Sequence, residues 1–381
     1  MNLFPDLKRR YTSERLSARE AQRQAEFIAW GPIVFQVSRL MVKFGILELL
    51  RNSKEGLTEA EVAKETGLSP YAVKCLLEAS LSIGIVLIET ESDRYTLSKT
   101  GWFLLNDPAT RVNIDFNHDV NYLGWFRLEE ALKEGRPAGL KHFGDWPTIY
   151  EGLSSLPGHV QDSWFGFDHF YSDSSFPEAL QIVFEEHSVR SLYDVGGNTG
   201  KWALQCVAYN KDVEVTILDL PQQIGMMQEN IAGKPGSERI KGFGINLLDK
   251  AADFPKREGG LDAIWMSQFL DCFGEEEIVS ILQRAKRAMD ADTRLFVMET
   301  FWDRQRFEPA AFCLTMTSLY FTAMANGNSK MYHSDDMMRL ILQAGLEIED
   351  IYDGLGQGHS IMVCRPHQTS PRGGFRDRHS P

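Results

Sequence analysis

From residue 176 onward, short apolar segments of strand character alternate with amphipathic helical segments, and this alternation limits the fold more than any other feature. Strands separated by helices of this length predict a doubly wound α/β sheet. The last two strand segments, however, are joined only by Gly354-Leu-Gly-Gln-Gly358. Because a parallel crossover needs about a dozen residues or more, the final strand must return antiparallel. The expected strands are 191–196, 213–220, 240–246, 261–269, 293–301, 346–354 and 358–366, and the expected helices are 176–188, 201–209, 222–231, 275–290 and 334–344.

A different pattern precedes the sheet, with the start and stop signals of two short helices followed by a hairpin. Thr58 and Glu61 form a capping box, Ser69 and Pro70 supply an N-cap with proline at the first helical position, and Gly84 ends the second helix. The expected hairpin strands are 85–89 and 94–97. Two helices and a hairpin in this order predict a winged helix.

Charge decides between the two common uses of a winged helix. The chain carries 40 Lys and Arg against 53 Asp and Glu, a net charge of −13, and residues 51–100 contain six basic and eight acidic side chains. Phosphate neutralisation needs clustered Lys or Arg, so nucleic acid is not expected as a partner. A winged helix with apolar faces and no basic stripe is better suited to oligomerisation.

The cysteines and the apolar segments indicate the compartment. Five scattered cysteines without CxxC spacing are typical of a reduced, cytoplasmic protein. The sequence contains neither paired cysteines nor an HExxH motif, so no metal site is expected. Residues 1–10 lack the apolar run of a signal peptide. The segment 31–50 is the most apolar, but Arg39 and Lys43 interrupt it, which predicts a buried amphipathic helix and no membrane contact.

A glycine-rich turn follows the first strand of the predicted sheet, at the carboxyl edge where ligands of such sheets bind. In Asp194-Val-Gly-Gly-Asn-Thr-Gly200 the glycines allow a tight turn and close approach of the backbone to a ligand. Asp219 ends the second strand, where a carboxylate can accept both hydroxyls of a ribose. Asp194, two residues before the first glycine, does not fit the dinucleotide fingerprint and is placed to face an amino group, which sulfonium cofactors carry and nicotinamide cofactors lack.

At these positions the chain resembles class I S-adenosylmethionine-dependent methyltransferases, and within them the winged-helix small-molecule O-methyltransferases of plant and bacterial natural-product pathways. The resemblance covers roughly residues 20 to 366, with a Rossmann-like seven-stranded sheet as the expected catalytic fold. It rests on Asp194–Gly200, Asp219-Leu-Pro221, Gly244-Ile-Asn-Leu-Leu248 and Asp262-Ala-Ile-Trp-Met-Ser-Gln-Phe-Leu270.

The resemblance implies four segments and a set of cofactor contacts. Residues 1–110 would form the dimerisation domain, 111–175 an aromatic helical linker contributing to the acceptor pocket, 176–366 the cofactor-binding catalytic domain and 367–381 a flexible tail. Gly196 and Gly197 would pass under the methionine moiety, close to Asp194, and Asp219 would hold the ribose. The remaining cofactor contacts implied are Leu220 and Leu247 on the two adenine faces, Asn246 at the adenine amino group, and Ser267 and Tyr171.

This chain departs from the family where the base is expected. Relatives read Leu-His-Asp-Trp after the fourth strand, whereas here the sequence is Leu270-Asp-Cys-Phe273, with Asp271 in place of histidine. An ordinary aspartate, with a pKa of about 4, is a poor base toward a phenol, so a catalytic Asp271 requires burial that raises its pKa. The alternatives are that Asp271 only orients or caps, with transfer by proximity, or that His333 is the base, unless His333 instead caps the following helix.

These observations predict a homodimeric S-adenosylmethionine-dependent methyltransferase that acts on a hydroxyl of a small aromatic acceptor. Because the usual histidine is absent, carbon or nitrogen acceptors stay open as alternatives. Two other classes compete with it: a cofactor-binding protein without transfer activity and a winged-helix regulator that senses the cofactor. The acidic winged helix speaks against the regulator.

Overall fold

The computed structural model describes residues 7–8 and 11–367, and the chain in it divides into two compact units. The helical unit comprises Thr12–Tyr122 and Pro157–Phe170. The sheet unit comprises Leu123–Leu156, the chain from Tyr171 onward and the described residues before Thr12. The predicted tail, 367–381, lies outside the described residues except for His367. The segment 1–10 also lies outside them, except for residues 7 and 8.

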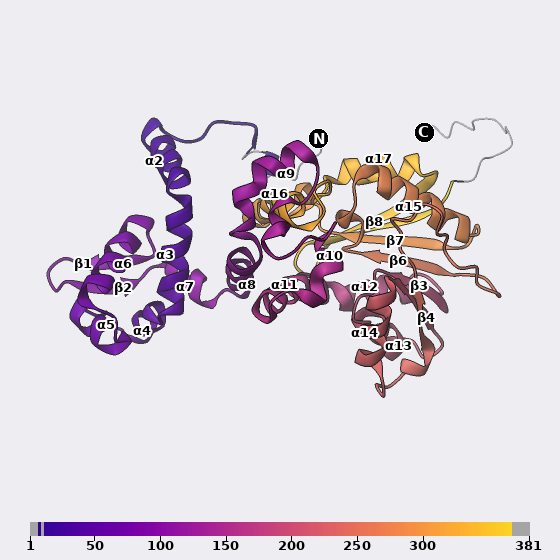
Figure 1. Ribbon diagram of the computed structural model, residues 1–381, viewed down its shortest axis with the longest axis horizontal. Coiled ribbons are helices and arrows are strands. Elements are labelled where there is room, and N and C mark those ends of the chain that lie inside the picture. Colours follow the sequence, from indigo (N-terminus) through magenta and orange to yellow (C-terminus); the bar gives the residue numbers. More distant parts are fainter. Residues whose placement is uncertain (1–6, 9–10, 368–381) are drawn as a thin grey trace, which may run out of the picture. The chain divides into compact units, whose positions relative to one another are not determined.

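The helical unit has the predicted order of two capped helices and a hairpin (Figure 1). Thr58 completes a capping box with Glu61, Ser69 accepts from the backbone N–H of Ala72, and Gly84 ends its helix in the left-handed region at φ 85°. Its hairpin strands pair antiparallel. The elements are α2 (Ala18–Ala29), α3 (Gly31–Lys43), α4 (Ile46–Asn52), α5 (Glu59–Thr66), α6 (Pro70–Ile83), β1 (Val86–Glu89), β2 (Arg94–Leu97), α7 (Lys99–Asn106), α8 (Pro108–Phe116) and most of α11 (Gly158–Ser172).

The apolar segment 31–50 forms two helices rather than the single predicted one. Gly45 adopts φ 73°, in the left-handed region that breaks the helical hydrogen bonding, and α4 begins directly after it. Both helices contribute to the core of the unit through side chains such as Met41 and Leu47. The preceding helix, α2, buries none of its residues.

The sheet unit contains the predicted seven-stranded sheet, with strand order β5-β4-β3-β6-β7-β9-β8. The first five strands along the chain pair parallel, whereas β9 lies antiparallel between β7 and β8. The prediction of an antiparallel final strand is therefore confirmed. The strands are β3 (Ser191–Val195), β4 (Glu214–Asp219), β5 (Ile240–Gly244), β6 (Ala263–Ser267), β7 (Arg294–Glu299), β8 (Leu346–Leu355) and β9 (His359–Pro366).

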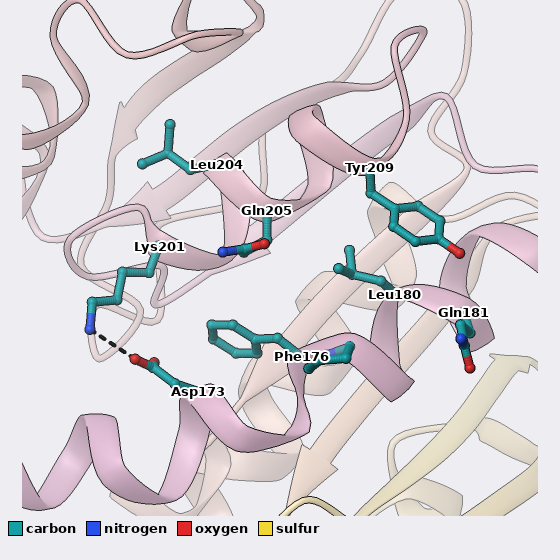
Figure 2. Close-up of a pocket in the computed structure, with 9 residues that line it drawn as sticks. Asp173, Phe176, Leu180, Gln181, Lys201, Leu204, Gln205 and Tyr209 are labelled. Atoms are coloured by element: carbon teal, nitrogen blue, oxygen red, sulfur yellow. Dashed lines mark hydrogen bonds and ion pairs between the residues drawn. The ribbon is translucent and has the colours of Figure 1, made fainter.

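Helices separate these strands as the alternation requires. Five of the six lie within a few residues of their predicted ranges, whereas α16 has no predicted counterpart. They are α12 (Phe176–Glu185), α13 (Lys201–Tyr209), α14 (Pro221–Ile231), α15 (Glu275–Ala288), α16 (Glu308–Tyr320) and α17 (Ser334–Gln343). An open groove of about 540 Å³ runs along α12 and α13 (Figure 2). At one end of it the Lys201 ammonium lies 2.9 Å from the Asp173 carboxylate.

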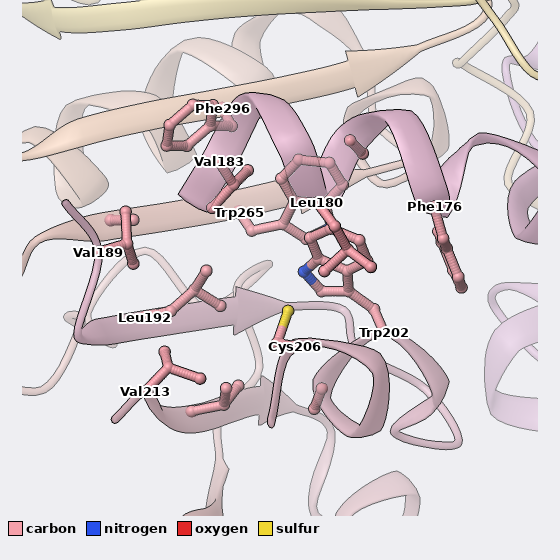
Figure 3. Packing of buried hydrophobic residues seen from close by; sticks show 14 of the residues in the cluster. Phe176, Leu180, Val183, Val189, Leu192, Trp202, Cys206, Val213, Trp265 and Phe296 are labelled. Carbon is pink, nitrogen blue, oxygen red and sulfur yellow. The ribbon is translucent and has the colours of Figure 1, made fainter. Parts of the chain in front are cut away.

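Two apolar cores cover the two faces of the sheet. On the α12 and α13 face, the indoles of Trp202 and Trp265 stack with their ring centroids 4.3 Å apart, beside Leu180 and Phe296 (Figure 3). The other core joins the sheet to α15 and α17. Together the two cores hold the strands in place. They therefore also position the edge of the sheet whose loops carry the candidate site.

The aromatic-rich stretch 101–175 is largely helical. Besides α7, α8 and α11 it contains α9 (Leu128–Glu134), α10 (Ile149–Gly152) and short 3₁₀ turns at Gly124–Arg127 and Ala138–His142. A π-helical turn, Asn117–Asn121, extends α8, and a second one, Phe321–Ala325, extends α16. Helices this short carry too few turns for a hydrophobic period to be visible in the sequence. Among the described residues no helix is long and apolar enough to cross a membrane.

Candidate active site

The glycine-rich turn between β3 and α13 can be built only from small residues. Gly196 has φ 73°, and a Cβ on it would lie 2.4 Å from the Phe269 ring. A Cβ on Gly197 would lie 2.6 Å from Oδ2 of Asp194. The chain therefore needs glycine at both positions, and the turn leaves its backbone open at the carboxyl edge of the sheet.

Asp219, at the end of β4, ties this turn to the next loop. Its Oδ2 accepts the backbone N–H of Asn198 at 2.9 Å, and its Oδ1 accepts the N–H of Leu220 at 2.7 Å. Burial raises the pKa of Asp219, and the two N–H donors partly oppose that rise. Each carboxylate oxygen keeps a second lone pair, so the group can still accept hydroxyl donors from a ligand.

Asp194 is almost completely buried directly under the turn. Its side chain is 2% exposed, and its Oδ2 has no hydrogen-bond partner among the described residues. Burial, and to a lesser degree the charge of Asp219, raises the pKa of Asp194 to about 8. A buried carboxyl without a donor is costly in the ionised form, so it is poised for a cationic or donor partner.

The other predicted cofactor contacts lie at the same edge of the sheet but differ in accessibility. Leu220 is the N-cap residue of α14, and Ser267 is the last residue of β6. Asn246 is exposed, and its Oδ1 accepts the N–H of Leu248 at 2.9 Å. Leu247, by contrast, is 7% exposed and its side chain belongs to the core of the sheet unit. Its side chain is therefore less available to a ligand than the resemblance implied.

Tyr171 stands apart from that group, in the last turn of α11. It is partly exposed, and its carbonyl oxygen accepts the hydroxyl of Ser174 at 3.2 Å. It is the first residue of the sheet unit after the helical segment 157–170. The cofactor contact of Tyr171 stays a prediction.

Asp271 lies in a 3₁₀ turn, Leu270–Cys272, and only 4% of it is exposed. Glu299, the last residue of β7, accepts the N–H groups of Phe269 and Leu270 on its Oε1 at 3.1 and 2.9 Å. Its Oε2 has no partner among the described residues. Burial, followed by the charge of Asp271, raises the pKa of Glu299 well above its ordinary value. Two acidic side chains thus share one buried region.

Aromatic and thiol groups complete the surroundings of Asp271. The Cys272 thiol donates to Asp271 Oδ1 at 3.4 Å, and burial and then that carboxylate raise the thiol pKa. The Tyr150 hydroxyl, on α10, is buried beside the Cys272 thiol. Burial raises its pKa well above the ordinary value, and Cys272, Tyr320 and Asp271 add to that rise.

Sequence reasoning missed both Glu299 and Tyr150. One feature of the sequence could have identified Glu299: it is a charged residue at the end of an otherwise apolar strand. An acid buried at such a position needs hydrogen-bond donors around it. Tyr150 had none, since it lies in a four-residue helix within an aromatic-rich stretch where tyrosine is common.

The contacts of His333 are those of a residue that caps a helix. It is the N-cap residue of α17, and its Nδ1 accepts the N–H of Asp335 at 3.0 Å. Its Nε2 lies 3.6 Å from Oδ2 of Asp303, and its ring meets the Trp302 indole edge-on with centroids 5.0 Å apart. A histidine whose Nδ1 accepts from the backbone carries its proton on Nε2 in the neutral form, which suits a cap better than a base.

No group of three or more metal-ligating side chains occurs among the described residues. The residues at the carboxyl edge instead fit an organic cofactor with a ribose and an amino group. The turn at Gly196 and Gly197 is a cradle that any Cβ would fill, and the unpartnered Asp194 carboxyl lies under it.

Comparison with known families agrees with this geometry. An O-methyltransferase domain model matches residues 175–347, and a Dimerisation2-like domain model matches residues 22–95. The chain belongs to the O-methyltransferase family. The catalytic-domain match begins at the helix before β3 and includes the glycine turn, Asp219, Asp271 and Glu299.

Known methyltransferases resemble this chain over most of its length. L-tyrosine C(3)-methyltransferase of Streptomyces lavendulae is 24% identical over 332 residues, which are 85% of this chain and 87% of that one. Mitomycin biosynthesis 6-O-methyltransferase of Streptomyces lavendulae is 21% identical over 343 residues, 89% of this chain and 92% of that one. The structure of human N-acetylserotonin methyltransferase with S-adenosylmethionine superposes with a TM-score of 0.64 at 18% identity, covering 93% of this chain and all of that one (100%).

Proposed function

We propose that this protein transfers the methyl group of S-adenosylmethionine to a hydroxyl of a small aromatic acceptor. The observation that carries the proposal is the glycine cradle over the unpartnered Asp194, next to the Asp219 carboxylate, within a chain of the O-methyltransferase family. The relatives act, by name, on tyrosine, a mitomycin precursor and acetylserotonin, which supports a small acceptor with aromatic or related chemistry.

The cofactor would be held by groups from four strand ends. Asp219 would accept the ribose hydroxyls, Asp194 would face the amino group, and the backbone at Gly196 and Gly197 would lie along the methionine moiety. Leu220, Leu247 and Asn246 would surround the adenine, and Ser267 and Tyr171 are proposed as further contacts. When bound, the sulfonium supplies an electrophilic methyl group, so the protein chiefly has to align the acceptor and exclude water.

Asp271 is the proposed base. It is buried, it follows β6 at the same edge as the cofactor contacts, and it shares its surroundings with Glu299. In this role its carboxylate would take the proton of the acceptor hydroxyl as the methyl group is transferred to the oxygen. The capping geometry of His333 favours Asp271 over His333, while transfer by proximity alone stays the alternative.

The segment 111–175 is proposed to contribute to the acceptor pocket, because part of it, Leu123–Leu156, belongs to the sheet unit and brings Tyr150 to Asp271. The segment 1–110 is proposed to form the dimerisation domain of a homodimer, which the Dimerisation2-like match supports. A cytoplasmic location and the absence of nucleic-acid partners also stay proposals, based on the scattered cysteines and the acidic charge.

A second candidate is transfer to carbon. The C(3)-methyltransferase among the relatives favours it, and so does the aspartate that replaces the expected histidine. The experiment that separates these functions incubates the protein with methyl-labelled S-adenosylmethionine and a panel of phenols that includes L-tyrosine. An acid-stable methyl ether identifies oxygen transfer and a ring-methylated product identifies carbon transfer. Binding of S-adenosylhomocysteine without any labelled product would leave a cofactor-binding protein that lacks transfer activity.

A further inference from the structure

Arg284, in the second half of α15, is a charged residue that the fold buries almost completely. Only 3% of it is exposed. Its guanidinium donates to the backbone carbonyls of Asp249 and Ala252 at 2.9 and 2.8 Å, and also to the carbonyl of Leu247. A guanidinium is costly to remove from water unless acceptors replace the water molecules, and here backbone carbonyls do so. Arg284 therefore holds a particular stretch of backbone.

The three carbonyls belong to the loop that follows β5, residues 245–252 (the β5 loop). Because β5 is an edge strand of the sheet, the loop has a neighbouring strand on one side only. On that side the N–H of Ile245 donates to the carbonyl of Asp219 at 2.8 Å. The rest of the loop forms two successive turns, each closed by a backbone hydrogen bond of 3.1 Å. Arg284 thus supplies, from α15, the support that no further strand provides.

The β5 loop is the segment to which the proposed function assigns the adenine. It leaves the sheet beside Asp219, which pairs with the last residue of β5. Asn246, the proposed contact of the adenine amino group, is exposed, and the next residue is Leu247, whose carbonyl Arg284 holds. Arg284 itself is too deeply buried to contact a ligand. Any effect that it has on binding must therefore act through the loop.

We propose that Arg284 is a positioning residue for cofactor binding, which holds the β5 loop in the conformation that lets Asn246 meet the adenine amino group. The proposal rests on the proposed function, which assigns this loop to the adenine. Without the guanidinium, three loop carbonyls lose their donor and the loop gains other conformations. The cofactor would then have to select the competent conformation when it binds, which lowers its affinity.

Arg239, just before β5, is a matched control for Arg284. Its guanidinium also donates to three backbone carbonyls, that of Val207 at 2.6 Å and those of Asn210 and Val213 at 2.8 and 3.2 Å. These carbonyls lie around the end of α13 and the start of β4, at the opposite edge of the sheet from the β5 loop. A substitution at either arginine removes the same kind of bond, but only Arg284 holds the β5 loop.

Calorimetric titration of the full-length protein with two ligands tests the inference. S-adenosylhomocysteine and S-inosylhomocysteine differ only where an oxo group replaces the purine amino group, and we expect the wild type to prefer the first. Arg284→Met should weaken S-adenosylhomocysteine roughly 10–100-fold, the equivalent of one lost charge-assisted hydrogen bond, and S-inosylhomocysteine less. Arg284→Lys keeps the charge with fewer donors and should lie between the two. Arg239→Met should leave both dissociation constants within about twofold of wild type.

The ratio of the two dissociation constants separates positioning from a merely structural role. An unfolded fraction lowers both affinities by the same factor and leaves their ratio unchanged. Amide hydrogen exchange without ligand gives a second readout, and it should become faster in the β5 loop of Arg284→Met but not of Arg239→Met.

Three results would overturn the inference. The first is an unchanged ratio in Arg284→Met, and the second is an equal change of the ratio in Arg239→Met. The third is a wild type that binds the two ligands equally, which would also remove the adenine amino group from the contacts of the β5 loop. A wild type that binds neither ligand would instead refute the proposed function, and the inference with it.

Discussion

Glu299 accepts a hydrogen bond from the backbone N–H of Leu270, the residue directly before Asp271, so the end of β7 holds the turn that carries the proposed base. The same carboxylate oxygen accepts the N–H of Phe269. Since Glu299 is buried and Asp271 raises its pKa, the two side chains cannot be treated as independent acids. Their ionisation is expected to be coupled, and this coupling governs the pH profile of a reaction that uses Asp271.

Asp271→Asn tests the base. The substitution keeps the size and the hydrogen-bonding capacity of the side chain but removes its basicity, so turnover should fall about 10²–10⁴-fold while affinity for S-adenosylhomocysteine stays nearly constant. In the wild type, turnover should rise with pH as the carboxyl pair loses its proton. Steady-state kinetics between pH 5 and 9 measure both effects. A loss of less than threefold would mean that proximity alone suffices.

His333→Ala is expected to act on stability rather than on chemistry. Removing the N-cap acceptor of α17 should lower the free energy of unfolding by about 0.5–2 kcal/mol, with turnover changed less than threefold. Urea unfolding and kinetics on the same preparation measure the two quantities. His333→Asn is the matched control, because asparagine is a good N-cap and should restore the stability. A large loss of turnover here, with little at Asp271, would move the base to His333.

Asp219→Ala removes a group with two roles, since its carboxylate accepts two backbone N–H groups and is proposed to hold the ribose. We expect S-adenosylhomocysteine binding to weaken by roughly 1–3 kcal/mol, because the ligand hydroxyls lose their acceptor. Calorimetry gives the dissociation constant, and far-UV circular dichroism checks that the glycine turn has not unfolded the domain. An unchanged dissociation constant would contradict the ribose assignment.

Asp194→Asn should change how stability depends on pH. The pKa of Asp194 is about 8 in the folded protein against about 4 in an unfolded chain, so between these values the folded state binds the extra proton. The contribution of this carboxyl to the free energy of unfolding of the wild type therefore falls as the pH rises from 4 to 8, by at most about 1.4 kcal/mol per pH unit. The melting temperature of Asp194→Asn relative to wild type should rise across this range. Parallel melting curves at all pH values would show that Asp194 is not protonated in the folded protein.

The exposed apolar side chains near the start of the helical unit locate the expected dimer contact. α2 buries none of its residues, and Phe27, Ile28, Trp30 and Ile33 are 44%, 67%, 64% and 53% exposed. Stable interfaces cover such surface, so Ile28→Glu combined with Ile33→Glu should convert the protein to a monomer in light scattering at micromolar concentration. Leu87→Glu, on an exposed position of β1, is the matched control and should leave the dimer intact. A monomeric wild type would contradict the homodimer.

The sheet could be predicted from sequence because its signals are local. Strand and helix alternate at regular lengths after residue 176, and the short turn at 354–358 excludes a parallel return of the last strand. The capped helices of the winged-helix region were visible for the same reason, since Thr58 and Ser69 act on neighbours three residues away. The break at Gly45 was missed, because an isolated glycine within an apolar segment does not by itself end a helix.

The candidate site was only partly predictable. Asp194, Asp219 and Asp271 follow strands, so their common edge follows from the parallel topology alone. The carboxyl of Glu299 and the hydroxyl of Tyr150 reach Asp271 through tertiary packing, and Leu247 turns into the core for the same reason. Apart from the charge of Glu299 at the end of an apolar strand, the sequence gives no sign of these contacts, which depend on how the loops and short helices fold over the sheet.

The position of β9 between β7 and β8 has a consequence for biosynthesis. Among the described strands β9 comes last in the chain, yet it pairs with one edge of β7 and with β8, and Ile361, Met362 and Val363 are fully buried on it. At a translation rate of about 5–20 residues per second, one edge of β7 stays unpaired for several seconds, whereas β8 is followed by β9 almost at once. The nascent sheet therefore stays incomplete until translation has passed Pro366, and during that interval the unpaired edge of β7 is open to pairing with a wrong strand.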